Sequence, residues 1–148
     1  MTWETIAKIR EKTRLKIILK GIMHPKDAEI ATNFCDAIWV SNHGGRQQDS
    51  ISSTIDILPS IKGAVGNKIP ILIDGGIRTG NDIFKCLALG ADYVFVGRPV
   101  PYSLVFGYLG VKKMVEILED ELKRCMILVG SHNLKDITAE SIVPEPTL

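Results

Sequence analysis

The chain has no long apolar run, no marked excess of either charge and no closely spaced cysteine pair. None of its hydrophobic stretches approaches the ~20 apolar residues that a membrane-spanning helix needs. The formal net charge is +1, which argues against broad electrostatic capture of nucleic acid or acidic membranes. Any specificity for anions must therefore come from a local arrangement of charges.

Cysteines are also few, and they do not form a disulfide pattern. The three thiols, Cys35, Cys86 and Cys125, are an odd number and lie far apart in the sequence. The N-terminus lacks the basic and apolar regions of a secretory signal, and the chain does not end in the peroxisomal address Ser-Lys-Leu. We therefore expect reduced thiols in an intracellular protein, either peroxisomal or cytoplasmic.

Strand-like and helix-like segments alternate in the order of parallel β/α units. The strands are apolar on both faces, which is typical of parallel strands buried between layers. An eight-fold barrel takes about 250 residues, so these 148 residues fit half of a barrel or a small open α/β sheet. Strands are expected at residues 16–20, 37–41, 70–73 and 93–96. Helices are expected at 3–13, 25–34, from a cap at Ser52 or Ser53 to 65, from Gly80 or Asn81 to 89, and at 111–129.

A histidine and an arginine follow the second expected strand, in the loop SNHGGR at residues 41–46. The carboxyl ends of parallel strands are where α/β barrels hold their catalytic groups. His43 can take a proton near neutral pH, and Arg46 can bind a carboxylate through two parallel hydrogen bonds. This pair is the first candidate for a catalytic and substrate-binding site.

Two glycine–arginine loops follow the next two strands, DGGIRTG at 74–80 and GRP at 97–99. Glycines let backbone N–H groups approach an anion, a helix N-terminus adds its positive end, and Arg78 and Arg98 add charge. The alternative is that the glycines only make tight turns and that the arginines are solvated. Because barrels often bind phosphate after their last two strands, two such loops in succession favour a phosphate site and half of a barrel.

Lys20 closes the first strand and allows two interpretations. Its ammonium group either extends to solvent along the apolar strand or forms a fixed positive charge at the barrel mouth. The three histidines, in contrast, do not have the spacing of metal ligands and no acidic cluster accompanies them. We therefore predict no metal site.

Four segments together resemble one enzyme family: LKGI at 19–22, SNHGGRQ at 41–47, DGGIR at 74–78 and GRP at 97–99. They are similar to the C-terminal half of the FMN-dependent α-hydroxy-acid oxidases and dehydrogenases, such as glycolate oxidase, lactate oxidase, mandelate dehydrogenase and flavocytochrome b2. The resemblance runs from about residue 3 to 138. The HGGR segment is specific to this group, whereas other phosphate-binding barrels such as IMP dehydrogenase carry a segment close to DGGIR.

The resemblance implies FMN as cofactor and oxidation of a 2-hydroxy acid to a 2-oxo acid, with oxygen as acceptor and hydrogen peroxide as product. It implies that His43 is the base, taking either the α-carbon proton or the hydroxyl proton. Arg46 would bind the substrate carboxylate, and Lys20 would lie beside the flavin N1/C2 edge. Ser41 would hydrogen-bond the flavin and Asp74 the ribityl hydroxyls. The full cofactor-binding set that the resemblance implies is Lys20, Ser41, His43, Asp74, Gly75, Gly76, Ile77, Arg78, Gly97 and Arg98, of which Gly76, Arg78, Gly97 and Arg98 hold the phosphate.

The first half of such a barrel has no counterpart before Trp3. In the family, that half supplies four strands, a further substrate arginine, pocket tyrosines and the aspartate that orients the catalytic histidine. We therefore expect a half-barrel domain over 1–138, a flexible tail at 139–148, and either a homo-oligomer or pairing with a missing N-terminal half. A small 2-hydroxy acid is the expected ligand, with no nucleic acid and no membrane as partner. The alternatives are another phosphate-binding barrel, similar to IMP dehydrogenase, and a non-catalytic half-barrel fragment.

Overall fold

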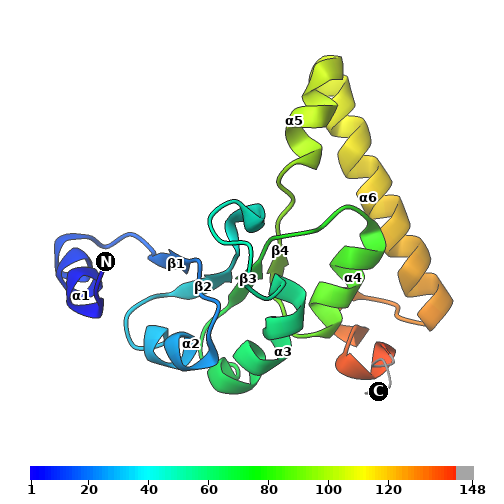
Figure 1. Ribbon diagram of the computed structural model, residues 1–148. Helices are drawn as coiled ribbons and strands as arrows, with labels where there is room; N and C mark the ends of the chain where they lie inside the picture. The colour runs from blue at the N-terminus through cyan, green and yellow to red at the C-terminus, as the bar shows by residue number, and fades with distance from the viewer. Residues whose placement is uncertain (143–148) are drawn as a thin grey trace.

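The computed structural model describes residues 1–142 and contains one parallel sheet with helices packed on it (Figure 1). The sheet has four strands in the order β1-β2-β3-β4, so each strand lies beside its neighbour in sequence. All three strand pairs are parallel, as the alternating order of strands and helices predicts. The strands are β1 (Ile18–Lys20), β2 (Ala37–Val40), β3 (Ile71–Ile73) and β4 (Tyr93–Val94).

Six α-helices accompany the sheet within the described residues. Short 3-10 turns occur at His43–Gly45, Leu104–Phe106, Leu134–Asp136 and Ala139–Ser141. The helices are α1 (Trp3–Lys12), α2 (Pro25–Ala31), α3 (Thr54–Val65), α4 (Gly80–Ala88), α5 (Pro99–Ser103) and α6 (Gly107–Val129).

Side chains at the helix starts explain why the helices begin where the sequence predicts. The hydroxyl of Ser53 accepts a hydrogen bond from the Asp56 amide at the start of α3. At the start of α4, Thr79 and Asp82 form a reciprocal capping box. Pro25 occupies the first turn of α2, where a missing amide proton costs nothing. These three predicted starts are confirmed.

Four elements differ from the predictions by two residues or more, among them β1, which begins at Ile18 rather than at 16. Helix α2 ends at Ala31 rather than at 34, because residues 32–34 turn with hydrogen bonds to the third residue before them. Helix α6 begins at Gly107 rather than at 111, and β4 pairs over Tyr93–Val94 only. The sequence analysis also missed α5, a short helix that Pro99 begins.

One face of the sheet is covered by helices α2, α3 and α4, which lie below it in Figure 1. Strand residues that point to this face are in register with one another, as Ile38 is with Ile71 and Val40 is with Ile73. They are inaccessible to solvent and form the main core with the helices. The fully buried members of this core are Ala28, Ala31, Ile38, Val40, Leu58, Ile61, Val65, Ile71, Ile73 and Cys86.

Within residues 1–142, no helix layer covers the other face of the sheet. Trp39 is in register with Lys20 and Leu72, and Leu72 is in register with Tyr93, so these four side chains share this face. Tyr93 is 60% exposed, and Ile18 and Phe95 on the edge strands are 46% and 38% exposed. The expectation that all four strands are buried on both faces is therefore wrong for β1 and β4.

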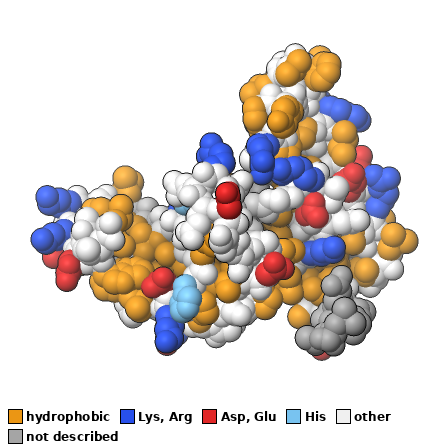
Figure 2. Space-filling model, viewed as in Figure 1, with side chains coloured by type: hydrophobic (Ala, Val, Ile, Leu, Met, Phe, Trp, Pro, Cys, Tyr) orange, Lys and Arg blue, Asp and Glu red, His pale blue; other side chains and the backbone are white. Residues whose placement is uncertain are grey.

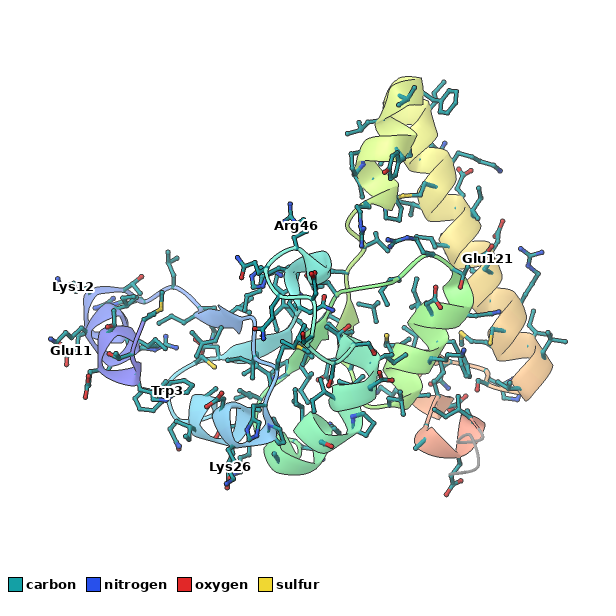
Figure 3. The ribbon with its side chains drawn as sticks, viewed as in Figure 1. Trp3, Glu11, Lys12, Lys26, Arg46 and Glu121 are labelled. Carbon is teal, nitrogen blue, oxygen red and sulfur yellow. The ribbon has the colours of Figure 1, made fainter. Side chains whose placement is uncertain are left out.

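Helices α4 and α6 pack closely at Gly80, where a Cβ atom would lie only 2.2 Å from the Leu122 amide nitrogen. The Gly80 amide donates a 2.7 Å hydrogen bond to the carboxylate of Glu121, which faces α4 in Figure 3. Ile142 packs against the second, smaller core cluster beside these helices, and the 3-10 turn Ala139–Ser141 precedes it. The rest of the predicted tail, 143–148, lies outside the described residues.

Beyond α4, the first half of α6 continues away from the sheet and α5 folds back against it (Figure 1). We call residues 99–115 the arm. A Cβ atom at Gly110 would lie 2.1 Å from the Ser103 carbonyl oxygen, so the two parts of the arm are in tight contact. The Ser103 hydroxyl also lies 3.8 Å from the Met114 sulfur. The arm is therefore a packed helical hairpin.

Candidate active site

A cavity of about 680 Å³ lies at the carboxyl ends of the four strands. It draws its lining from the end of every strand and from the loops that follow β2, β3 and β4. All but one of the residues predicted for the site border it. Its lining is Lys20, Trp39, His43, Gly44, Arg46, Asp74, Gly75, Gly76, Ile77, Arg78, Phe95, Val96, Gly97, Arg98 and Pro101.

Ser41 is the exception, and it lies directly behind the wall of the cavity. Its side chain is buried, and its hydroxyl accepts a 2.5 Å hydrogen bond from the ammonium of Lys20 while donating a 2.6 Å bond to Asp74. The same ammonium lies 2.8 Å from the other carboxylate oxygen of Asp74. Lys20 is therefore a fixed positive charge at the rim and does not extend freely into solvent, which decides between the two interpretations of this residue.

Asp74 thus contacts Lys20 and Ser41. The carboxylate partly neutralises the lysine, and the closed ring of three hydrogen bonds ties together the ends of β1, β2 and β3. An incoming ligand can compete for either partner because the ion pair remains partly exposed. The ring therefore holds both charged groups in place before a ligand arrives.

His43 adopts a left-handed backbone conformation with φ of 55°, which is uncommon for a residue with a side chain. Its amide donates a 3.2 Å hydrogen bond to the Ser41 hydroxyl. The imidazole lies against Gly21, because a Cβ atom there would be 3.1 Å from the ring carbon Cε1. Within residues 1–142, the hydrogen bonds of His43 are made by its backbone amide and carbonyl groups. The loop therefore positions the ring through its backbone and through the space that Gly21 leaves.

Arg46 and Arg98 approach the His43 loop from two sides. The Nε of Arg46 donates a 3.2 Å hydrogen bond to the His43 carbonyl, and its guanidinium points away from the sheet (Figure 3). A guanidinium nitrogen of Arg98 lies 3.5 Å from the Gly44 carbonyl. The structure therefore brings one imidazole and two guanidinium groups to the same rim.

The glycine loop after β3 contains two residues with left-handed backbone conformations. Gly75 and Gly76 have φ values of 100° and 76°, which favour glycine. A Cβ atom would meet nothing within 4 Å at Gly76 or at Gly97, so both backbones face open space. Ile77 contributes differently, since its side chain is buried in the main core.

The backbone amides at the N-terminus of α4 are less available to an anion than the sequence suggests. The Arg78 and Thr79 amides both donate to the Asp82 carboxylate, at 2.9 and 2.8 Å. Although partial burial opposes ionisation, these hydrogen bonds hold the pKa of Asp82 below its ordinary value. Anion binding here must therefore depend on the glycine backbones and on the arginine side chains.

These residues fit a flavin mononucleotide. Arg78, Arg98 and two unobstructed glycine backbones suit a phosphate, and Lys20 with Ser41 and Asp74 suits the polar edge and the hydroxyls of such a ligand. The cavity is also within the size range of cofactor sites. The donor set is therefore the one expected for a flavin with a single phosphate.

The sequence analysis missed Trp39 and Phe95, which form the apolar floor of the cavity. Their rings are 4.2 Å apart, and the Lys20 ammonium lies 4.8 Å from the Trp39 ring centre. The indole nitrogen of Trp39 is buried without a hydrogen-bond partner in the described residues. The alternation of strand side chains could have found Trp39, because it lies two residues before Ser41 and points to the same face.

Metal sites and membrane-spanning helices were also searched for among the described residues. No group of three or more His, Cys, Asp or Glu side chains in residues 1–142 could hold a metal ion. In the same part of the chain, no helix combines the length and the apolar character that crossing a bilayer requires.

A parallel β/α sheet with an anion-binding rim defines the class of flavin- and phosphate-binding barrels. The family model described as FMN-dependent dehydrogenase matches residues 1–144. The chain therefore belongs to the FMN-dependent dehydrogenase family, a family of FMN-using oxidoreductases. The predicted family is confirmed.

Curated relatives agree with this assignment. The chain is 46% identical to a 2-hydroxyacid oxidase of Dictyostelium discoideum over 139 residues, which are 93% of this chain and 36% of that protein. It is 43% identical to an L-lactate oxidase of Lysinibacillus sphaericus (97% and 38%) and 44% identical to human 2-hydroxyacid oxidase 1 (99% and 40%). The chain thus spans about two fifths of the length of these relatives.

Solved structures give the same picture for the fold. A mandelate oxidase bound to 3,3-difluoro-2-hydroxy-3-phenylpropionic acid superposes with a TM-score of 0.89 at 40% identity, over 94% of this chain and 43% of that one. A variant of mandelate oxidase with a monooxide FMN adduct gives 0.87 at 41% identity, over 91% and 44%. The α/β fold and the predicted half of a TIM barrel are confirmed.

Proposed function

We propose that this chain is the flavin-binding and catalytic half of an oxidase that converts a small 2-hydroxy acid to the 2-oxo acid, with oxygen as acceptor and hydrogen peroxide as product. The observation that carries the proposal is the convergence of Lys20, His43, Arg46 and Asp74 with the two glycine–arginine loops on one cavity. Another phosphate-binding barrel would need the glycine–arginine loops but not the histidine–arginine pair. The names of the curated relatives support the same substrate class.

Arg46 binds the substrate carboxylate in this proposal. Its guanidinium is exposed at the rim and offers two parallel donors, a geometry that suits a carboxylate. His43 lies three residues earlier on the same loop and takes the proton from the substrate. Because one loop carries both groups, a bound carboxylate places the hydroxyl-bearing carbon near the imidazole.

Lys20 and Ser41 hold the flavin edge and Asp74 holds the ribityl chain, while the phosphate is held by Gly76, Arg78, Gly97 and Arg98. When bound, FMN supplies the two-electron acceptor. The fixed ammonium of Lys20 stabilises negative charge at the adjacent rim, and Ser41 keeps it in position.

We also propose that a second half-barrel covers the open face of the sheet. The exposed apolar side chains of Ile18, Tyr93 and Phe95 support this, because edge strands with exposed apolar groups tend to acquire a partner. In this proposal the partner is the missing N-terminal half or another copy of this chain.

The three free thiols support an intracellular location.

Titration of the purified chain with FMN tests the site, and bound flavin is read from its absorbance and from the quenching of its fluorescence. We expect Arg98→Gln to weaken FMN binding by about tenfold, because it removes one charge-assisted contact. Arg124→Gln is the matched control, since it removes an exposed arginine on α6. Equal FMN affinity in all three proteins would contradict the site.

Anaerobic addition of glycolate or lactate to the FMN-loaded chain then tests the reaction. We expect bleaching of the flavin, its loss in His43→Gln with FMN still bound, and weaker substrate binding in Arg46→Met. Flavin that binds but is not bleached by either acid would favour the non-catalytic half-barrel.

A further inference from the structure

Trp39 lines the cavity but has no role in the proposed function. Its side chain lies beside that of Lys20, because the two residues are in register on neighbouring parallel strands, which are about 4.8 Å apart. The Lys20 ammonium lies 4.8 Å from the centre of the Trp39 ring. A cation within about 6 Å of an indole ring is attracted by the negative face of that ring. Trp39 is therefore a third partner of the ammonium, besides Ser41 and Asp74.

Trp39 is fixed through both its backbone and its ring. Its carbonyl oxygen accepts hydrogen bonds from the amides of Gly21 at 3.0 Å and Ile22 at 3.3 Å, the two residues that follow Lys20. Its ring centre is 4.2 Å from that of Phe95, the residue directly after β4, so an aromatic neighbour supports the indole. The indole therefore offers Lys20 a surface that is itself held in place.

The three partners of Lys20 differ in how they respond to a bound flavin. In the proposed function Ser41 contacts the flavin edge and Asp74 the ribityl chain, so each can exchange its contact with Lys20 for one with the ligand. The indole has one hydrogen-bonding group, the N–H at its edge, so its face has no such contact to exchange. Because the Lys20 side chain is 36% exposed, its ammonium has room to move when the two oxygen contacts weaken. The indole face is then the partner that remains.

We propose that Trp39 is a positioning residue that keeps the Lys20 ammonium beside the flavin when Ser41 and Asp74 turn to the ligand. This inference rests on the proposed function, because it uses the place assigned there to Lys20. An ammonium held at that edge stabilises the negative charge that the flavin gains on reduction. A residue that only filled space would affect the binding of oxidised and reduced FMN by the same factor. Trp39, acting through Lys20, favours the reduced form.

Amine labelling of the FMN-free chain tests the contact between Trp39 and Lys20. The chain is treated briefly with acetic anhydride, and the labelling of each lysine is read by mass spectrometry. Lys113 is the internal reference, because its side chain is 69% exposed on α6, where Figure 2 shows Lys and Arg side chains at the surface. We expect Trp39→Leu to raise the labelling rate of Lys20 relative to Lys113 by about fivefold, the effect of losing one cation–π contact. Trp39→Phe keeps a ring and should raise it less.

Trp3→Leu is the matched control. Trp3 also stacks on a phenylalanine, with ring centres 5.5 Å apart, but it lies on α1 and does not border the cavity. This variant should leave the labelling of Lys20 unchanged, and circular dichroism should show the same helix content in every variant. Equal labelling of Lys20 in Trp39→Leu and in the unchanged chain would overturn the proposal. So would equal increases in Trp39→Leu and Trp3→Leu, which would show a general loosening of the chain.

Redox titration of the FMN-loaded chain tests the consequence for the flavin. We expect Trp39→Leu to lower the preference for reduced over oxidised FMN about fivefold, which lowers the two-electron midpoint potential by about 20 mV. Lys20→Met should lower the potential further, and Trp3→Leu should leave it unchanged. A fall in Lys20→Met with none in Trp39→Leu would overturn this proposal alone. An unchanged potential in Lys20→Met, or a chain that binds no FMN, would contradict the proposed function, and the labelling rates would still decide whether Trp39 holds Lys20.

Discussion

The two faces of the sheet are built from the same strands, yet one is sealed and the other is open. Ile38, Val40, Ile71 and Ile73 point to the helices and are inaccessible to solvent. Their neighbours along the strands point the other way, to the open side. The apolar content of a strand therefore does not tell which of its side chains stabilise the fold.

The open face also contains the chemistry. Lys20, Trp39 and Asp74 follow the same alternation and reach the cavity at the carboxyl rim. The sealed face supplies the buried area that keeps these groups in position. Four changes test this division between stability and function, in order of decreasing expected effect.

The largest effect is expected from Ile73→Ala on the sealed face. Deleting these buried methyl and methylene groups leaves a cavity, so the free energy of unfolding should fall by about 2–5 kcal/mol. Urea denaturation measures this change. Ile18→Ala on the open face removes the same atoms from a half-exposed site and should cost less than half as much. Equal losses of unfolding free energy in the two variants would mean that both faces of the sheet contribute equally to stability.

Gly80→Ala should be the next largest change, because its Cβ would collide with the α6 backbone at Leu122. Overpacking of this kind should lower the free energy of unfolding by about 1–3 kcal/mol. Gly63→Ala in α3 is the control, since its Cβ meets nothing within 4 Å. The Gly63→Ala variant should be more stable than the unchanged chain by about 0.5–1 kcal/mol. Thermal denaturation of both variants should therefore show a lower midpoint for Gly80→Ala and a higher one for Gly63→Ala.

Asp36 provides a pH test at the amino ends of the strands. The Arg10 guanidinium, the Ile17 amide and the Lys16 ammonium hydrogen-bond its carboxylate and hold its pKa well below the ordinary value. Because the folded pKa is depressed, the stabilisation is present above about pH 4 and is lost as the pH falls further. Asp36→Asn should therefore lower the thermal midpoint at neutral pH, and its difference from the unchanged chain should shrink in acid.

This change should not alter FMN binding, since Asp36 lies at the opposite end of the strands from Asp74. An Asp36→Asn variant with a constant deficit from pH 7 to pH 3 would refute the role of the carboxylate charge.

Tyr93→Ser should have the smallest effect on stability. The side chain is 60% exposed on the open face, so the free energy of unfolding should change by about 0.5 kcal/mol or less. The same change removes apolar surface, so binding of a hydrophobic dye should decrease. A loss of several kcal/mol would show that the open face is packed in solution.

Much of the fold follows from local signals. The apolar β-branched runs indicate the strands, and the helix starts were indicated by Pro25, by Ser52 or Ser53, and by Gly80 or Asn81. The loops that follow the strands also indicated the cavity residues, because parallel strands present their carboxyl ends at one edge. Helix α5 and the early start of α6 were not predicted. Gly110 lies within α6 and packs closely against Ser103, which is a tertiary contact.

The sequence by itself determined the order of the β/α units, the family and the set of residues at the rim, because these depend on neighbours along the chain. Only the tertiary structure decided that Lys20 is fixed by Asp74 and Ser41, which are 54 and 21 residues away from it in sequence. It also decided that one face of the sheet is open. These features depend on which elements pack together, and long-range packing leaves no periodic signal in the sequence.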